Sequence, residues 1–91
     1  ADIIDIRKPS EYTAGHVEGA RNLPLDYIND HMASFKKDEP QYVHCAGGYR
    51  SMIASSILKA RGYHNVVNVE GGYGAIEKTN VPKATGEPAK A

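Results

Sequence analysis

Short apolar runs rich in β-branched residues recur along this chain and constrain its fold more than any other feature. They occupy residues 2–6, 41–45 and 65–69, and a further short strand is expected within 19–24. Continuous apolar character is typical of parallel strands whose two faces are both covered. Helical patterns lie between the runs, so the order of elements predicts an α/β domain with a mostly parallel sheet and right-handed crossovers.

The intervening segments predict three helices. Asp26 is placed to cap a helix near 27–35, where apolar residues recur on one face. Residues 51–61 form the clearest helix, and Gly62 is expected to end it. A further short helix is expected after Gly72.

The length of the chain, 91 residues, suffices for one compact domain. We assign residues 1–80 to this domain and expect residues 81–91, which lack a periodic apolar face, to form a flexible tail. Because the chain enters its first strand with no cap or turn before it, we expect it to be a fragment of a longer protein.

Charge and composition narrow the range of partners. Eleven basic residues balance eleven acidic ones, so no broad positive field is available to hold nucleic acid or an anionic membrane surface. The apolar runs are too short to cross a bilayer. A lone cysteine and the absence of a targeting segment favour a reducing, cytoplasmic location. Four dispersed histidines offer no zinc-ligand spacing, so neither a metal nor a cofactor is predicted.

The segment that carries chemistry joins the second apolar run to the clearest helix, and it reads Cys45, Ala46, Gly47, Gly48, Tyr49, Arg50. Ligands of parallel sheets bind at the carboxyl ends of strands, where the N-terminus of a helix directs free N–H groups. Glycines let the main chain aim successive N–H groups at one anion. Such surroundings lower a thiol pKa from about 8.5 to roughly 3.5–7.5. The pattern therefore predicts a reactive thiolate at Cys45 rather than a merely buried small side chain.

This segment, HCAGGYRS, resembles the active-site loop of the rhodanese family, and the resemblance extends over nearly the whole chain. DIIDIRKPSEYTAGHVEGARNLPL resembles the family's upstream signature, and RGYHNVVNVEGG resembles the passage after the active-site helix. The resemblance implies a rhodanese-like three-layer domain with helices on both faces of a mostly parallel sheet. It also implies a sulfurtransferase that passes a sulfane sulfur from thiosulfate or a low-molecular-weight persulfide to a thiophilic acceptor.

Carried over by position, the resemblance makes Cys45 the sulfur carrier and residues 46–50 the surrounding anion loop. It makes Asp5 and Arg7 supports of that loop from a neighbouring strand. The strand pattern by itself is equally compatible with a structural ion pair between these two residues.

Loop length separates two related chemistries. Four residues lie between Cys45 and Arg50, whereas the similar cell-cycle phosphatases have one more and a wider ring. A narrower ring suits a single sulfur better than a tetrahedral phosphate, so phosphatase or arsenate reductase activity ranks below sulfur transfer.

Two departures from the family pattern stand out. The usual domain begins with another short strand and helix, so a sheet edge or core face is expected to lie uncovered here. Tyr73 stands where a tryptophan is common. HCAGGYRSMIA and GGYGAI especially resemble rhodanese domains fused behind metallo-β-lactamase-fold persulfide dioxygenases. A fused or partner domain, and a non-catalytic or relay role within a larger protein, therefore remain alternatives.

Neighbouring residues invite roles of their own. His44 precedes the thiol, but successive strand residues face opposite sides, which predicts a packed histidine rather than a general base. His16 is expected to stabilise the fold, and Tyr49 to shape the mouth of the pocket.

Overall fold

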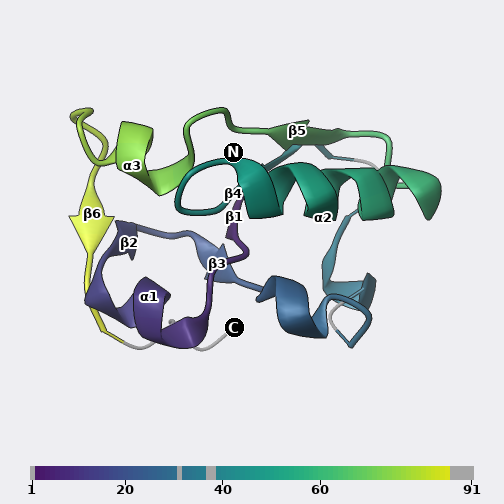
Figure 1. Cartoon of the computed structure of the whole chain (residues 1–91), viewed down its shortest axis with the longest axis horizontal. Helices are drawn as coiled ribbons and strands as arrows, with labels where there is room; N and C mark the ends of the chain where they lie inside the picture. Colours follow the sequence, from purple (N-terminus) through teal and green to yellow (C-terminus); the bar gives the residue numbers. More distant parts are fainter. Residues whose placement is uncertain (1, 31, 37–38, 87–91) are drawn as a thin grey trace.

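The computed structural model describes residues 2–30, 32–36 and 39–86, and at its centre lies a four-stranded parallel sheet (Figure 1). Its strands are β1 (Asp2–Asp5), β3 (Arg21–Asn22), β4 (Gln41–His44) and β5 (Val66–Asn68), in the order β3-β1-β4-β5. The predicted α/β class with a parallel sheet is confirmed, and all four strands lie within the segments where the sequence places them.

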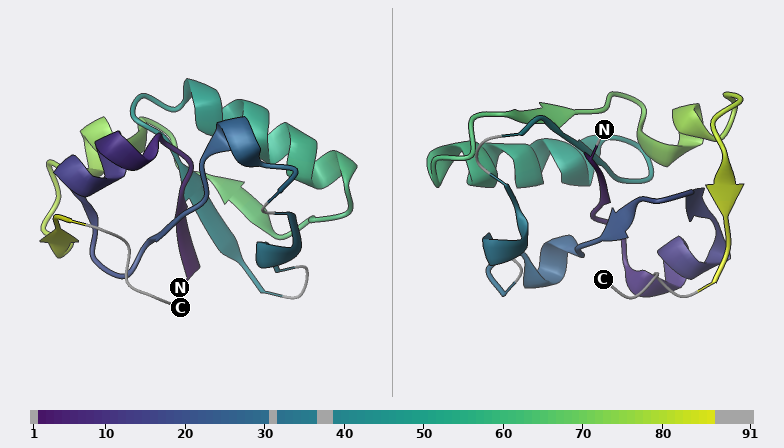
Figure 2. Two further views of the ribbon diagram at one scale, coloured as in Figure 1. Left: turned by 90° about the horizontal axis from the view of Figure 1, so that it is seen from below. Right: turned by 180° about the vertical axis from the view of Figure 1, so that it is seen from behind.

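The remaining elements divide between the two sides of this sheet. They are α1 (Pro9–Ala14), β2 (His16–Val17), the 3₁₀ turns η1 (Leu25–Tyr27) and η2 (Met32–Ser34), α2 (Tyr49–Ala60), α3 (Gly72–Ile76) and β6 (Lys83–Ala84). Figures 1 and 2 show α1, α3, β2 and β6 gathered on one side, with α2, η1 and η2 on the other. Strands β2 and β6 form a separate antiparallel pair.

Alternation along the strands divides the core into two apolar clusters. Ile4 and Val43, both fully buried, face the cluster under α2, where Leu58 is also fully buried. Ile3 faces the second cluster, which contains Tyr12 of α1 and Tyr73 of α3. Successive strand residues point to opposite faces of the sheet. Each core residue in β1 and β4 therefore faces a different cluster from the residues directly before and after it.

The longest helix, α2, begins at Tyr49, two residues earlier than predicted, because Gly48 at φ 99° turns the chain directly into it. It ends at Ala60, one residue before the predicted end at residue 61, and Gly62, whose φ is 92°, terminates it as predicted. The N–H of Tyr63 donates to the Leu58 carbonyl at 2.9 Å and that of Gly62 to the Lys59 carbonyl at 3.2 Å, the bonding pattern of a Schellman cap.

The helix predicted near 27–35 is wrong, because the chain forms only η1 and η2 there with a turn between them. Asp26 caps nothing, since Pro24 is the N-cap of η1 and makes no side-chain bond. Asn29 and Asp30 lie between the two turns, and their short polar side chains favour turns over helix interior. The apolar residues of the pattern, including Ile28 and Phe35, are still buried.

The predicted looseness from residue 81 onward is wrong for part of that segment. Residues 83–84 form β6, which pairs with β2, and the N–H of Gly86 donates to the Thr13 carbonyl at 2.8 Å. This pairing uses main-chain groups, so it requires no apolar periodicity in the sequence. Residues 87–91 of the predicted tail lie outside the described residues.

The sheet face that carries Ile3 and Tyr42 is only partly covered. An apolar hollow of about 310 Å³ lies there, lined by Ile3, Val17, Tyr42, Val69, Ile76 and Val81. Within the described ranges, every helix is too short or too polar to span a membrane.

Replacing Leu58 with alanine is expected to lower the free energy of unfolding by about 2–4 kcal/mol, because the side chain is fully buried between α2 and the sheet. Met52 on the same helix is 58% exposed, so Met52→Ala is the matched control and should change stability by about 0.5 kcal/mol or less. Urea denaturation measures both. Equal losses in the two variants would contradict the assignment of Leu58 to the core.

Candidate active site

The loop after β4 folds back over the sulfur of Cys45. The N–H of Gly48 donates to Sγ at 3.0 Å, and the Ser51 hydroxyl oxygen lies 3.6 Å from Sγ. Only the second glycine of the loop takes a positive φ, and this conformation at Gly48 turns its N–H inward. The side chain of Cys45 is 1% exposed, so the sulfur lies beneath the loop rather than on the surface.

The pKa of the Cys45 thiol reflects two opposing effects. Burial raises it, since a thiolate loses hydration, but hydrogen bonds from the Ser51 hydroxyl and from nearby backbone N–H groups outweigh burial. The N–H donors belong to Ser51, Gly48 and Gly47. The net effect holds the thiol pKa below its ordinary value. The buried sulfur is therefore suited to carry negative charge.

The outer side of the loop is held by α3. The N–H of Tyr73 donates to the carbonyl of Cys45 at 2.6 Å, and that of Gly74 donates to the carbonyl of Ala46 at 3.0 Å. Gly72, at φ 56°, packs so closely that a Cβ there would lie 2.7 Å from the Ala46 carbonyl oxygen. These contacts fix the carbonyls of the loop outward, which leaves its N–H groups free to face the sulfur.

His44 lies on the sheet face opposite Cys45, as strand alternation predicts, and is fully buried. Its Nδ1 is 3.2 Å from the carbonyl oxygen of Cys45, so this nitrogen carries the proton and donates. Burial lowers the pKa of His44, which favours the neutral ring. His44 therefore packs behind the loop and is not placed to deprotonate the thiol.

Asp5 and Arg7 form a buried ion pair behind His44. Nη2 of Arg7 lies 2.7 Å from an Asp5 carboxylate oxygen, and the guanidinium stacks 4.2 Å from the centre of the Tyr73 ring. The same carboxylate lies 3.8 Å from Nε2 of His44. The structure thus brings the pair against His44 and Tyr73, which contact the loop, rather than against the sulfur itself.

The guanidinium of Arg50 is engaged by a carboxylate of α1. Its two terminal nitrogens donate to the two carboxylate oxygens of Glu11, at 2.8 and 3.0 Å. The hydrogen bonds from Arg50 lower the pKa of Glu11 to about 2, so the pair is fully ionised near neutral pH. Tyr49, next to Arg50, is 74% exposed at the outer surface of the loop.

Several residues of this site were not singled out by the sequence pattern. Ser51 could have been found, because a hydroxyl in the first turn of the helix after the loop is within reach of the thiol. Glu11 and Gly72 lie far from Cys45 in the sequence, and no local pattern indicates that they contact the loop.

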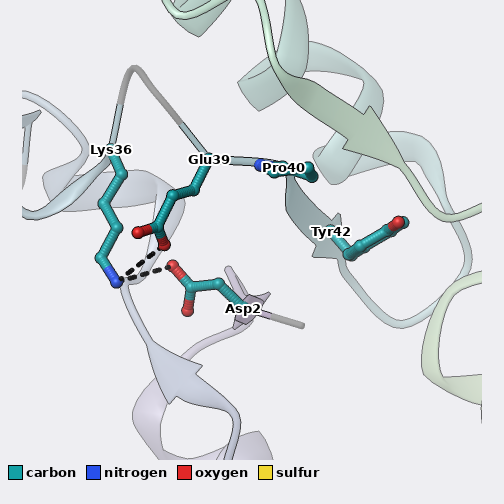
Figure 3. A pocket seen from close by; sticks show the side chains of 5 residues that line it. All are labelled: Asp2, Lys36, Glu39, Pro40 and Tyr42. Atoms are coloured by element: carbon teal, nitrogen blue, oxygen red, sulfur yellow. Dashed lines mark hydrogen bonds and ion pairs between the residues drawn. The ribbon is translucent and has the colours of Figure 1, made fainter.

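Another hollow lies at the opposite end of the sheet from Cys45, and Figure 3 shows the side chains that line it. It measures about 560 Å³ and is lined by Asp2, Lys36, Glu39, Pro40 and Tyr42. Asp2 begins β1 and Pro40 directly precedes β4, so this hollow adjoins the amino ends of the strands. Parallel sheets bind ligands at the carboxyl ends, where Cys45 lies. Among the residues described, no cluster of three or more histidine, cysteine or acidic side chains could hold a metal ion.

The rhodanese-like domain family matches residues 1–79. A crystal structure of a rhodanese-like domain protein from Staphylococcus aureus superposes with a TM-score of 0.82 at 38% sequence identity, covering 89% of this chain and 78% of that chain. This chain therefore belongs to the rhodanese-like domain family, and the predicted rhodanese-like α/β fold is confirmed.

Two relatives are similar to this chain over the same number of residues. Thiosulfate sulfurtransferase GlpE of Pseudomonas entomophila is 36% identical over 73 residues, which cover 80% of this chain and 67% of that protein. The uncharacterized protein YqhL of Bacillus subtilis is also 36% identical over 73 residues, covering 80% of this chain and 58% of that protein. The aligned part thus spans between 58% and 67% of these relatives.

Replacing Gly72 with alanine is expected to lower the free energy of unfolding by about 2–4 kcal/mol, because a Cβ would collide with the loop carbonyls in a left-handed backbone conformation. Gly47→Ala is the matched control, since a Cβ at Gly47 meets nothing within 4 Å. Its effect should stay within about 0.5 kcal/mol. Chemical denaturation compares the two, and an unchanged Gly72→Ala variant would contradict close packing of α3 on the loop.

Replacing Ser51 with alanine is expected to raise the pKa of Cys45 by about one unit, because the thiolate loses a hydrogen bond to a hydroxyl. The pH dependence of alkylation by iodoacetamide measures the change, and alkylation at neutral pH should slow. Ser56→Ala is the control, because its hydroxyl bonds to the Met52 carbonyl on the exposed side of the same helix. A shift of equal size in both variants would rule out a specific contribution of Ser51.

Proposed function

We propose that this domain is a sulfurtransferase in which Cys45 carries a sulfane sulfur as a persulfide. The observation that supports the proposal most strongly is the 3.0 Å hydrogen bond from the N–H of Gly48 to Sγ, within a loop whose donors favour the thiolate. Kinship with proteins named thiosulfate sulfurtransferase supports the same reaction class.

In the first step, the Cys45 thiolate attacks the outer sulfur of a donor such as thiosulfate. A bond forms between Sγ and that sulfur, the sulfur–sulfur bond of thiosulfate breaks, and sulfite leaves with the bonding electron pair. We assign no general base to this step, because the hydrogen-bond donors of the loop lower the pKa of the thiol and so favour the thiolate. A low-molecular-weight persulfide reacts in the same way and releases its thiolate.

In the second step, a thiophilic acceptor attacks the outer sulfur of the Cys45 persulfide. With cyanide, a carbon–sulfur bond forms, the persulfide bond breaks, and Sγ leaves as the thiolate while thiocyanate is released. The N–H groups of residues 46–50, at the start of α2, stabilise the negative charge on the transferred sulfur. Arg50 is the last residue of this loop, and its guanidinium is held by Glu11 of α1.

Cys45 is 1% exposed, so a donor reaches Sγ only after a local movement of the residues that cover it. Tyr49, 74% exposed on this loop, borders the entrance and contributes to the choice of acceptor. Asp5 and Arg7 support the loop indirectly, through His44 and Tyr73.

The proposal predicts that the protein incubated with thiosulfate gains the mass of one sulfur atom and releases it as thiocyanate when cyanide is added. Cys45→Ser should reduce thiocyanate production by about 10³-fold or more, because the hydroxyl is a far weaker nucleophile at neutral pH. Intact mass spectrometry and colorimetric thiocyanate measurement check both. Sustained turnover in Cys45→Ser would contradict the assignment of Cys45 as the nucleophile. Hydrolysis of aryl phosphates without sulfur uptake would favour a phosphatase.

A further inference from the structure

The cation that ends the active-site loop is held by a carboxylate from another element. The two terminal nitrogens of Arg50 each donate a hydrogen bond to one carboxylate oxygen of Glu11. The side chain of Arg50 is 31% exposed and that of Glu11 is 33% exposed. A bidentate pair of this kind fixes the direction of the guanidinium plane. It also presents an approaching anion with a carboxylate beside the positive charge.

The other charges close to Arg50 are similarly balanced. A cavity of about 40 Å³ beside Arg50 is lined by Ile6, Lys8, Pro24, Leu25, Asp26 and Arg50. Lys8 and Arg50 supply positive charge to this cavity and Asp26 supplies negative charge, while Glu11 adds a second negative charge through its pair with Arg50. The other arginine near the site, Arg7, is paired with Asp5. Attraction for the donor therefore depends mainly on the N–H groups of the loop, whose partial charges fall off over a short distance.

We propose that Glu11 is a specificity-determining residue that, by holding the Arg50 guanidinium, disfavours doubly charged sulfur donors relative to singly charged ones. The inference rests on the proposed sulfur transfer. It assigns the donor class as sulfur compounds with at most one negative charge at the reacting end, such as organic persulfides or thiosulfonates, ahead of inorganic thiosulfate.

Coulombic interaction scales with the charge of the donor, which makes the effect of Glu11 measurable. A carboxylate at the entrance costs a dianion about twice the free energy that it costs a monoanion at the same place. Glu11→Gln keeps the size of the side chain and one oxygen acceptor for Arg50 but removes the charge. Both donors should then bind better, and the dianion should gain more.

Thiosulfate and benzenethiosulfonate provide this comparison with the same chemistry at sulfur. Thiosulfate is a dianion that transfers its outer sulfur to Sγ and releases sulfite. Benzenethiosulfonate is a monoanion that transfers its terminal sulfur and releases benzenesulfinate. In both cases cyanide then removes the sulfur as thiocyanate and restores the Cys45 thiolate, so one assay follows both donors.

The test is steady-state kinetics of the protein and of Glu11→Gln with each donor at low and high ionic strength. In Glu11→Gln, KM for thiosulfate should fall about five- to tenfold and KM for benzenethiosulfonate about two- to threefold, with little change in kcat. Added salt should shrink both gains, because exposed charges are screened. Glu18→Gln is the control, since it removes the same charge from an exposed turn, and its kinetics should match those of the unaltered protein.

Two other outcomes would overturn the inference in distinguishable ways. If Glu11→Gln lowers kcat equally with both donors and the change is insensitive to salt, Glu11 only braces α1 against the loop. If the unaltered protein produces no Cys45-dependent thiocyanate from either donor, the proposed sulfur transfer itself fails, and the inference fails with it.

Discussion

The N–H of Gly48 points at the sulfur of Cys45 across 3.0 Å, and the rest of the site depends on that direction being maintained. A buried thiol without such donors is less acidic than a free one, because a thiolate in apolar surroundings loses its hydration. Here the N–H groups of the loop supply the hydrogen bonds that water would make to an exposed thiolate. The same donors that favour the thiolate also suit a persulfide anion, so one arrangement serves the resting and the loaded states of the proposed cycle.

The loop keeps this arrangement because its outer face is bound to the second half of the chain. Tyr73 and Gly74 at the start of α3 donate to the carbonyls of Cys45 and Ala46, and Gly72 allows the close approach. Strand alternation places Cys45 on the face covered by α2, while His44 lies on the other face with the Asp5–Arg7 pair. The polar cluster behind the sheet thus stabilises the scaffold of the loop without touching the sulfur.

Local patterns in the sequence predicted the strands, the end of α2 at Gly62 and the position of Cys45 between a strand and a helix. These features depend on backbone preferences and apolar periodicity over a few residues. The helix near 27–35 failed because turn-forming Asn29 and Asp30 outweigh the apolar spacing. β6, Gly72 against the loop and Glu11 against Arg50 could not be predicted, because each is a contact between segments distant in sequence. The roles assigned to individual loop residues remain predictions.

Charge at the site is therefore organised in two tiers: inward N–H groups at the sulfur, and ion pairs that neutralise the arginines around it. The most direct measurement is the ionisation of the Cys45 thiol in the unaltered protein, followed by thiolate ultraviolet absorbance as a function of pH. Since this is the chain's lone cysteine, the signal has a single source. An apparent pKa clearly below the value of about 8.5 for a free cysteine is predicted. A value at or above that of free cysteine would contradict stabilisation of the sulfur anion by the loop.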